Sequence, residues 1–193
     1  MRHTLFVRAT HWIHTAGFVA LAVSGVAILL AHPRLYWGET GSVGTGSLLD
    51  LPLPFVLVGQ SGWGRYLHFL SAWVCVINGS LYAVFGLSTR HFGQNMAQNY
   101  NVLQRLTYLV VVFALFPLML WTGFAMSPAL TSVFPALVTI LGGQQSARTI
   151  HFFAAGALML FLLVHITMVY RTGFATHLRA MTTGHVANRK ERA

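Results

Sequence analysis

The stretch RTIHFFAAGALMLFLLVHITMVY, residues 148–170, decides the fold of this 193-residue chain. From Ile150 to Tyr170 it carries only a few polar side chains, and it is long enough to cross the ~30 Å hydrocarbon core of a bilayer as a helix. Two of those polar side chains are His151 and His165. Ionisable side chains at this depth are costly, so both histidines are candidates for a functional site.

Three more apolar runs of similar length precede this one, and together they predict an all-α fold, a transmembrane four-helix bundle. The expected spans are residues 10–31, 66–87, 103–126 and 150–170, within a single domain that covers residues 1–193. The composition agrees, because 55% of the residues are hydrophobic and only 8% are charged, against about 25% charged in soluble domains. Small residues recur in the spans, which favours close approach of helices or of a flat ligand. They include Ser24, Gly25, Gly79, Ser80, Gly123 and Gly156.

The net charge of +9 indicates membrane topology rather than nucleic-acid binding, because the basic residues lie at the ends of apolar runs. Nine of the 12 Lys and Arg residues fall on the side of the membrane that holds both termini. By the positive-inside rule the termini and the tail 171–193 are cytoplasmic, and the loops 32–64 and 127–149 face outward. We therefore expect a multi-pass protein of the bacterial inner (cytoplasmic) membrane, surrounded by lipid.

Depth in the membrane sorts the histidines of the spans into two pairs. The first span runs outward, which places His11 near the cytoplasmic face, and the second returns, which places His68 near the outer face. The fourth span starts outside, so His151 lies near the outer face and His165 near the inner face. These last two are 14 residues apart, about 21 Å along a helix and close to four full turns, so they share one helix face at two levels.

Two ligands at each of two depths suit two non-covalent haems, each held between two histidines and stacked across the membrane. The predicted axial pairs are His11 with His165 and His68 with His151. A zinc site would instead bring three or four ligands to one point. Covalent haem attachment is excluded, because the one cysteine, Cys75, is not in a Cys-x-x-Cys-His motif and is interpreted as a buried apolar residue. His14 shares a helix face with His11 and stays open as an alternative ligand.

An Arg precedes three of these histidines by three residues, at Arg8, Arg65 and Arg148. Each lies on the histidine's side of its helix, one turn nearer the membrane surface. Haem propionates point to the surface and bind cations, for which the guanidinium group is well suited. The sequence predicts these residues as propionate partners. The alternative is that Arg is simply common at helix ends.

The order of these motifs resembles a known family. Arg-x-x-His-Trp (8–12), Gly-Arg-x-Leu-His (64–68) and His-x13-His (151–165) look like motifs of the di-haem cytochrome b subunits of membrane-bound nickel–iron hydrogenase, formate dehydrogenase and thiosulfate reductase, which are cytochrome b561-like. The resemblance covers nearly the whole chain. It implies that the matched histidines are axial ligands of two haem b groups. It also implies electron transfer between a catalytic subunit on the outer side and the quinone pool.

The resemblance further implies a quinone site. In the formate dehydrogenase branch, an Asn in a Tyr-Asn-x-x-Gln stretch at the start of the third helix lies beside the inner haem. Tyr100-Asn101-Val102-Leu103-Gln104 matches this stretch, although Leu103 departs from the small residue expected there. Asn101 and Gln104 fall at the inner boundary, where they would hydrogen-bond a quinone carbonyl. The alternative is that they cap the helix or bind water.

The first outer loop resembles the thiosulfate-reductase-like branch through His-Pro-Arg-Leu-Tyr-Trp-Gly, residues 32–38. Members of that branch look like partners of periplasmic molybdenum enzymes. Tyr36 and Trp37 suit a docking surface, and equally an aromatic belt at the membrane interface. We expect an electron-transfer subunit that links a periplasmic catalytic redox subunit to quinone. The alternatives are a stand-alone cytochrome b561-type enzyme, such as a superoxide:quinone oxidoreductase, and a transporter that uses histidines as a proton relay.

Overall fold

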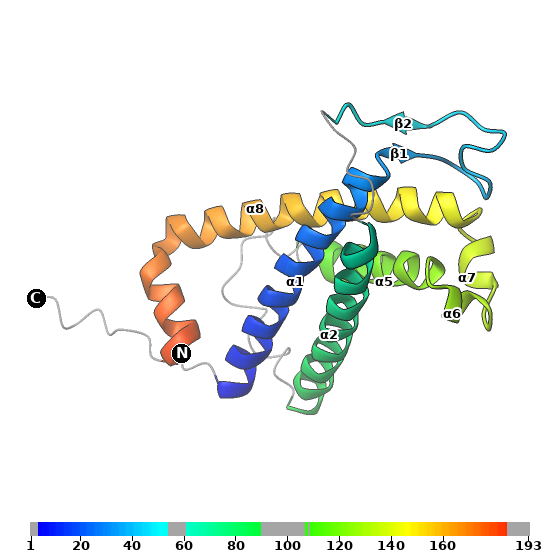
Figure 1. Ribbon diagram of the computed structural model, residues 1–193. Coiled ribbons are helices and arrows are strands. Elements are labelled where there is room, and N and C mark those ends of the chain that lie inside the picture. Colours follow the sequence, from blue (N-terminus) through cyan, green and yellow to red (C-terminus); the bar gives the residue numbers. More distant parts are fainter. Residues whose placement is uncertain (1–3, 54–60, 90–106, 108, 185–193) are drawn as a thin grey trace, which may run out of the picture. The chain divides into compact units, whose positions relative to one another are not determined.

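The computed structural model describes residues 4–53, 61–89, 107 and 109–184 (Figure 1). The chain divides into two compact units by its internal contacts. Unit 1 comprises residues 1–32, 55–97 and 165–193, and unit 2 comprises residues 33–54 and 98–164. His11, His68 and His165 belong to unit 1, and His151 belongs to unit 2.

Long apolar helices dominate the described residues, which confirms the all-α membrane class. Helix α1 spans Leu5–Ala31, α2 spans Ser61–Ser88 and α8 spans Gln144–Thr183, and each is long and apolar enough to cross a membrane. The third predicted span is described only in part, as the π-helix η1, Val111–Leu115, which continues into α5, Phe116–Ala125. Residues 103–106 and 108 of that span lie outside the described residues.

Short elements connect these helices. Strands β1, Arg34–Leu35, and β2, Leu49–Asp50, form an antiparallel pair in the first outer loop, and α6, Pro128–Thr131, and α7, Ala136–Thr139, follow α5. The sequence pattern does not predict the two strands. Arg34 Nε lies 3.0 Å from Asp50 Oδ2 across the pair, and the carboxylate raises the pKa of the guanidinium group. Because both side chains are exposed, this ion pair contributes little to stability.

The helices extend beyond the predicted spans. Thr4 is the N-cap of α1, and its Oγ1 accepts a hydrogen bond of 3.3 Å from the backbone N–H of Val7. Helix α8 starts six residues before the predicted Ile150 and continues well past Tyr170. At Gly173 the backbone leaves helical geometry, with φ 113° and ψ 76°, so the first part of the predicted tail is a second, kinked helical segment.

Small residues at seven-residue intervals hold α1 against α2 in unit 1. Thr10, Gly17 and Ser24 on α1 and Gly64, Ser71 and Asn78 on α2 are all buried, and we call this set the α1/α2 seam. A Cβ built on Gly17 would lie only 2.6 Å from Cys75 Sγ, so the helices approach closely at that point. Asn78 Nδ2 donates a hydrogen bond of 2.8 Å to the carbonyl of Thr10. Close packing of small residues is how helices associate in lipid, where the hydrophobic effect does not drive them together.

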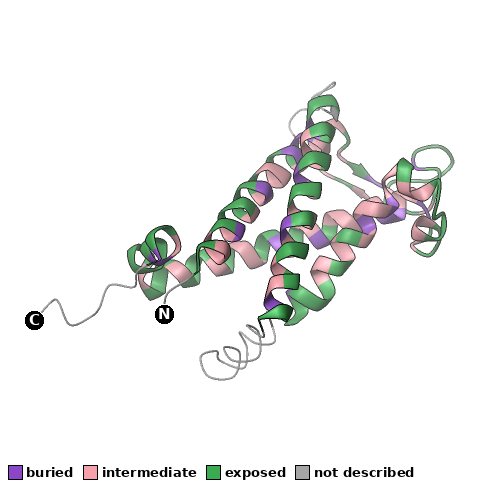
Figure 2. Ribbon diagram, turned by 90° about the horizontal axis from the view of Figure 1, so that it is seen from below, coloured by how far each residue is buried: buried purple, intermediate pink, exposed green. Residues whose placement is uncertain are grey.

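The outer faces of the helices are apolar and exposed. Figure 2 shows exposed or half-buried residues along most of each helix, with buried ones at intervals. The exposed side chains include large apolar ones such as Val19, Trp73, Leu81 and Leu160. A water-soluble protein rarely exposes so much apolar surface, whereas lipid chains cover such a surface without cost.

Candidate functional site

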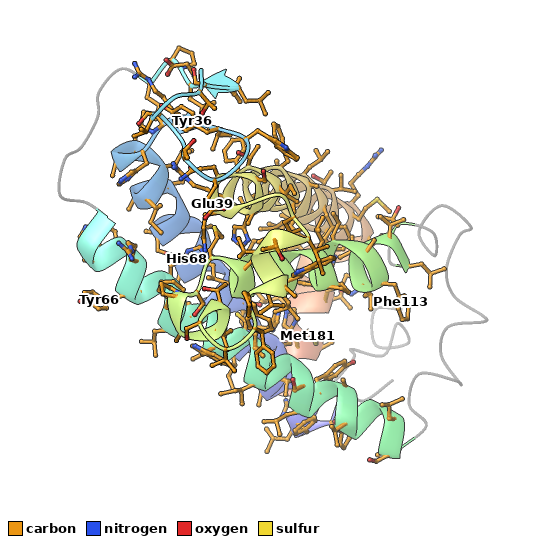
Figure 3. The ribbon with its side chains drawn as sticks, turned by 90° about the vertical axis from the view of Figure 1, so that its right-hand side faces the viewer. Tyr36, Glu39, Tyr66, His68, Phe113 and Met181 are labelled. Carbon is orange, nitrogen blue, oxygen red and sulfur yellow. The ribbon has the colours of Figure 1, made fainter. Side chains whose placement is uncertain are left out.

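His68, labelled in Figure 3, sits on α2 and contacts a hydroxyl–glycine pair of α1. Ser24 Oγ lies 2.9 Å from His68 Nδ1. The next residue, Gly25, is packed against the ring, because a Cβ built on it would lie 3.7 Å from His68 Cε1. Both helices belong to unit 1, and the histidine is half-buried between them. The α1/α2 seam therefore fixes the ring orientation of the predicted outer ligand.

His151 in unit 2 has the same surroundings, supplied by different elements. Thr122 Oγ1 of α5 lies 2.8 Å from His151 Nδ1 of α8. Gly123 follows it, and a Cβ built on Gly123 would lie 3.8 Å from His151 Cε1. Each of the two predicted outer ligands thus has a hydroxyl group at Nδ1 and a glycine at Cε1. From the sequence, Ser24, Gly25 and Gly123 are expected only as small residues of the spans, and Thr122 is not predicted. The signal available was the repeated pattern of a hydroxyl residue followed by Gly within a span.

The two candidates in the N-terminal half of α1, His11 and His14, are both half-buried. Asn78 Nδ2 lies 3.5 Å from His14 Nδ1, and the same amide donates to the Thr10 carbonyl. An amide donor at Nδ1 favours the form of His14 that carries its proton on Nε2, which leaves neither nitrogen well placed to bind iron. His11 instead lies against Trp12, with ring centroids 5.5 Å apart. The choice of His11 over His14 stays a prediction.

The three predicted propionate partners, Arg8, Arg65 and Arg148, differ in how far they are buried. Arg8 is half-buried, and its Nη1 donates a hydrogen bond of 2.8 Å to the carbonyl of Thr182 at the end of α8. Its Nε is buried and has no hydrogen-bond partner within the described part of the chain. A buried cationic donor of this kind fits an anionic group such as a propionate. Arg65 is exposed and Arg148 is half-buried.

The first outer loop is attached to the N-terminus of α8, the helix that carries His151. The carboxylate of Glu39 accepts a hydrogen bond of 3.0 Å from the backbone N–H of Gln144. The carbonyl of Gly38 accepts from the N–H groups of Gln145 and Ser146, at 3.0 and 3.3 Å. The first N–H groups of a helix have no partner within the helix, and its N-terminus attracts negative charge, so this loop caps α8.

Side chains of α8 return two more hydrogen bonds to the same loop. Ser146 Oγ accepts from the N–H of Gly38 at 2.8 Å, and Thr149 Oγ1 donates to the carbonyl of Tyr36 at 2.6 Å. Figure 3 labels Tyr36 and Glu39, which both come from this loop. We call residues 36–39 and their bonds to α8 the loop–helix clamp. It fixes one end of the loop while leaving Trp37, Val43 and Leu48 exposed, at 53%, 77% and 60%.

An apolar groove of about 390 Å³ lies in unit 2 between the third span and α8. Its lining includes Val111 and Leu115 of η1 and Leu160 and Phe161 of α8. This volume is in the range of small-molecule sites, and the lining suits an apolar group.

Among the described residues, His, Cys, Asp and Glu side chains form no group of three or more that could hold a metal ion. A bis-histidine haem needs only two ligands, one on each side of the iron. Asn101 and Gln104, the predicted quinone residues, lie outside the described residues.

Comparison with known proteins identifies the family of the chain. The family model for prokaryotic cytochrome b561 matches residues 2–184. A protein of Azospira oryzae, which carries the provisional name protein-methionine-sulfoxide reductase subunit YedZ1, is 28% identical over 196 residues, covering 86% of this chain and 89% of its own length. No solved structure matches the chain. The chain therefore belongs to the prokaryotic cytochrome b561 family and is a membrane electron-transfer protein that binds haem b.

Proposed function

We propose that this protein is the di-haem membrane subunit of a two-part redox system, which carries electrons between a periplasmic oxidoreductase and the quinone pool. The observation that carries the proposal is the matched setting of His68 and His151, each with a hydroxyl group at Nδ1 and a glycine against the ring. A hydrogen-bond partner at the ring nitrogen that does not bind the metal is characteristic of metal-binding histidines. A proton relay has no need for a flat, small-residue surface beside each ring.

The residues then have distinct tasks. His68 and His151 hold the outer haem, and His11 and His165 hold the inner one. Each bound haem supplies a one-electron carrier whose potential the protein sets through ligation, burial and nearby charge. Arg8, Arg65 and Arg148 bind propionates near the membrane surfaces, and the buried Nε of Arg8 supports this role most directly.

Quinone binds at the inner side, with Asn101 and Gln104 as hydrogen-bond donors to its carbonyl groups. Both termini are cytoplasmic, in the inner membrane of a bacterium, as the distribution of Lys and Arg indicates. Oxidation of a quinol there releases two electrons and two protons. The electrons leave through the protein towards the outer side.

The outer partner binds over the first outer loop. The loop–helix clamp holds this loop on the helix of His151, and Trp37 is exposed beside it, as an aromatic docking residue would be. The provisional name of the Azospira relative makes a protein-methionine-sulfoxide reductase the first partner to test. Such an enzyme consumes two electrons and two protons, converts the sulfoxide to the thioether and releases water. The resemblance to the thiosulfate-reductase-like branch makes a molybdenum enzyme the expected type of catalytic subunit.

The first experiment is a reduced-minus-oxidised spectrum of the purified protein, with haem and protein counted separately. We expect two low-spin haem b groups per chain. Ala substitutions at His11, His68, His151 and His165 should each remove one haem, whereas His14→Ala should retain both. A single haem per chain, or loss of the inner haem from His14→Ala but not from His11→Ala, would contradict the assignment.

The second experiment separates a subunit from a stand-alone enzyme. In liposomes that contain a quinol, we expect reduction of the haems. We expect no continuous quinol oxidation until the periplasmic reductase and a sulfoxide substrate are added. Trp37→Ala should raise the reductase concentration needed for half-maximal turnover without changing the haem spectrum. Full superoxide-dependent quinone reduction by the purified protein alone would favour the superoxide:quinone oxidoreductase instead.

A further inference from the structure

The hydroxyl groups of Ser24 and Thr122 each have one proton, and the helix backbone already takes it. Ser24 Oγ donates to the carbonyl of Ala20, four residues earlier, at 2.7 Å. Thr122 Oγ1 donates in the same way to the carbonyl of Leu118 at 2.8 Å. A hydroxyl group carries a single donor and two acceptor positions, so each oxygen is left as an acceptor.

With the hydroxyl proton on the backbone carbonyl, the neighbouring histidine is the donor. In that arrangement, with an oxygen 2.9 Å from His68 Nδ1 and 2.8 Å from His151 Nδ1, each neutral imidazole carries its proton on Nδ1. The other ring nitrogen, Nε2, then keeps its lone pair, which is the form that binds a metal ion. The ring position is fixed as well, because Ser24 and Thr122 are both fully buried, with 0% exposure.

We propose that Ser24 and Thr122 are positioning residues for the outer haem, which select the Nδ1–H form of His68 and His151 and so set the basicity of both axial ligands. This inference rests on the proposed role of the two histidines as ligands. A hydrogen bond donated from Nδ1 increases the electron density on Nε2, and a more basic ligand stabilises ferric over ferrous iron. A neutral hydroxyl oxygen accepts more weakly than a carboxylate, so the effect is moderate at each ligand.

The same positions explain why each hydroxyl residue is followed by glycine. Ser24 and Gly25 are adjacent on α1, and both reach His68, one at Nδ1 and the other near Cε1. Thr122 and Gly123 do the same for His151. Any side chain at the glycine positions would extend towards the ring that the preceding hydroxyl group orients. The pair therefore contacts the imidazole at two points, the hydroxyl group at Nδ1 and the glycine near Cε1.

A purely structural role for these hydroxyl groups is the competing explanation, since both also bond their own helix. The positioning role and the structural role predict different effects of a substitution on the midpoint potential of the haem. The test is a redox titration of the purified holoprotein, followed optically, together with low-temperature EPR of the ferric state. The removing variants, which lack the hydroxyl group, are Ser24→Ala and Thr122→Val. Thr122→Val keeps the shape of the side chain. The controls are Thr122→Ser, which keeps the hydroxyl group, and Ser71→Ala, which removes a buried serine elsewhere on the α1/α2 seam.

We expect Ser24→Ala and Thr122→Val to raise the midpoint potential of one haem, the same one in both variants, with the haem count unchanged. The double variant should shift that haem by roughly the sum of the two single shifts, because each substitution acts on a different ligand. The EPR g-values of the same haem should change as the rings lose their fixed orientation. Thr122→Ser and Ser71→Ala should leave both the potential and the g-values near those of the natural protein.

Three results would overturn the inference. They are unchanged potentials in both removing variants, shifts in two different haems, or a shift in Ser71→Ala as large as that in Ser24→Ala. If the proposed function itself is wrong, the haem count gives a different result, because His68→Ala or His151→Ala then keeps both haems. A chain that loses haem from the histidine variants but shows no potential shift in the hydroxyl variants would retain its proposed function and reject the positioning role.

Discussion

Arg8 Nη1 of α1 lies 2.8 Å from the carbonyl oxygen of Thr182, in the last turn of α8. Four residues along α1, the indole Nε1 of Trp12 lies 3.0 Å from the carbonyl oxygen of Met181. The last carbonyl groups of a helix have no partner within it, and they attract positive charge. The start of α1 therefore caps the end of α8 within unit 1. Arg8 Nη1 belongs to this cap, while its buried Nε has no hydrogen-bond partner among the described residues.

Trp12→Phe should loosen the end of α8 while keeping an aromatic ring beside His11. It removes the indole donor and leaves Met181 with an unsatisfied carbonyl, a loss of about 1 kcal/mol. Hydrogen exchange should become faster in residues 179–184, with the haem count unchanged. Arg8→Gln should loosen the same turn and also shift the potential of one haem, since it removes a charge. Equal potentials in Arg8→Gln and Trp12→Phe would show that Arg8 is a cap alone.

Gly17→Ala should destabilise the contact between α1 and α2. The new methyl group would lie 2.6 Å from Cys75 Sγ, which forces the helices apart at a cost of about 1–3 kcal/mol. The midpoint of thermal unfolding in detergent, followed by loss of the haem Soret band, should fall. Gly79→Ala is the matched control, because a Cβ there meets nothing within 4 Å among the described residues.

The double variant Gly17→Ala with Cys75→Ala identifies the cause. Removing Sγ takes away the atom that the new methyl group would strike, so the double variant should be more stable than Gly17→Ala alone. If it is equally unstable, the loss comes from the helix backbone and not from the contact with Cys75.

Glu39→Gln should weaken the loop–helix clamp while keeping the size of the side chain. The carboxylate at the N-terminus of α8 contributes about 0.3–1 kcal/mol through its charge, so the loop should be cut faster by protease added from the outer side. High salt should reduce the difference between Glu39→Gln and the natural protein. A difference that is unaffected by salt would mean that the hydrogen bond to Gln144, and not the charge, is what matters.

Gly143→Ala should break the loop–helix clamp more severely. Gly143 has φ 118°, and a Cβ there would lie 2.5 Å from the carbonyl oxygen of Gly38. Gly44→Ala is the control for backbone strain alone, because its φ is also positive, at 87°, but a Cβ meets nothing within 4 Å in the described part of the chain. We expect Gly143→Ala to weaken binding of the periplasmic partner strongly and Gly44→Ala only slightly. The measurement is the reductase concentration needed for half-maximal turnover.

The sequence predicts the apolar helices well, because membrane spans follow from hydropathy and length. It predicts their ends poorly. Helix α1 starts at Leu5 rather than Thr10, since the cap at Thr4 lies outside the apolar run, and α8 continues past Tyr170 to Thr183. The loop–helix clamp depends on backbone groups of Gly38 and Gln145, which carry no sequence signal.

For the site as well, the sequence predicts the depth of a residue in the membrane but not the side chain that it contacts. Depth alone separates the candidate histidines into inner and outer ones, because depth follows from position along a span. The partners of His68 and His151 depend on which neighbouring helix packs where, so Thr122 could not be found from the periodicity of its own helix. The axial pairs, the propionate contacts of Arg65 and Arg148, and the quinone residues stay predictions.

The π-helix η1 governs the register of the third span. The N–H of Phe116 bonds the carbonyl of Val111, five residues back, so this turn holds one residue more than an α-helical turn. Everything after it, including Thr122, is turned by about 100° relative to an uninterrupted α-helix of the same length. A change that straightens the turn at constant length would move Thr122 away from His151. Deleting one residue within Val111–Leu115 would straighten it and keep Thr122 in place. In this short segment, a deletion that restores α-helical geometry should therefore be less damaging than a substitution that does so.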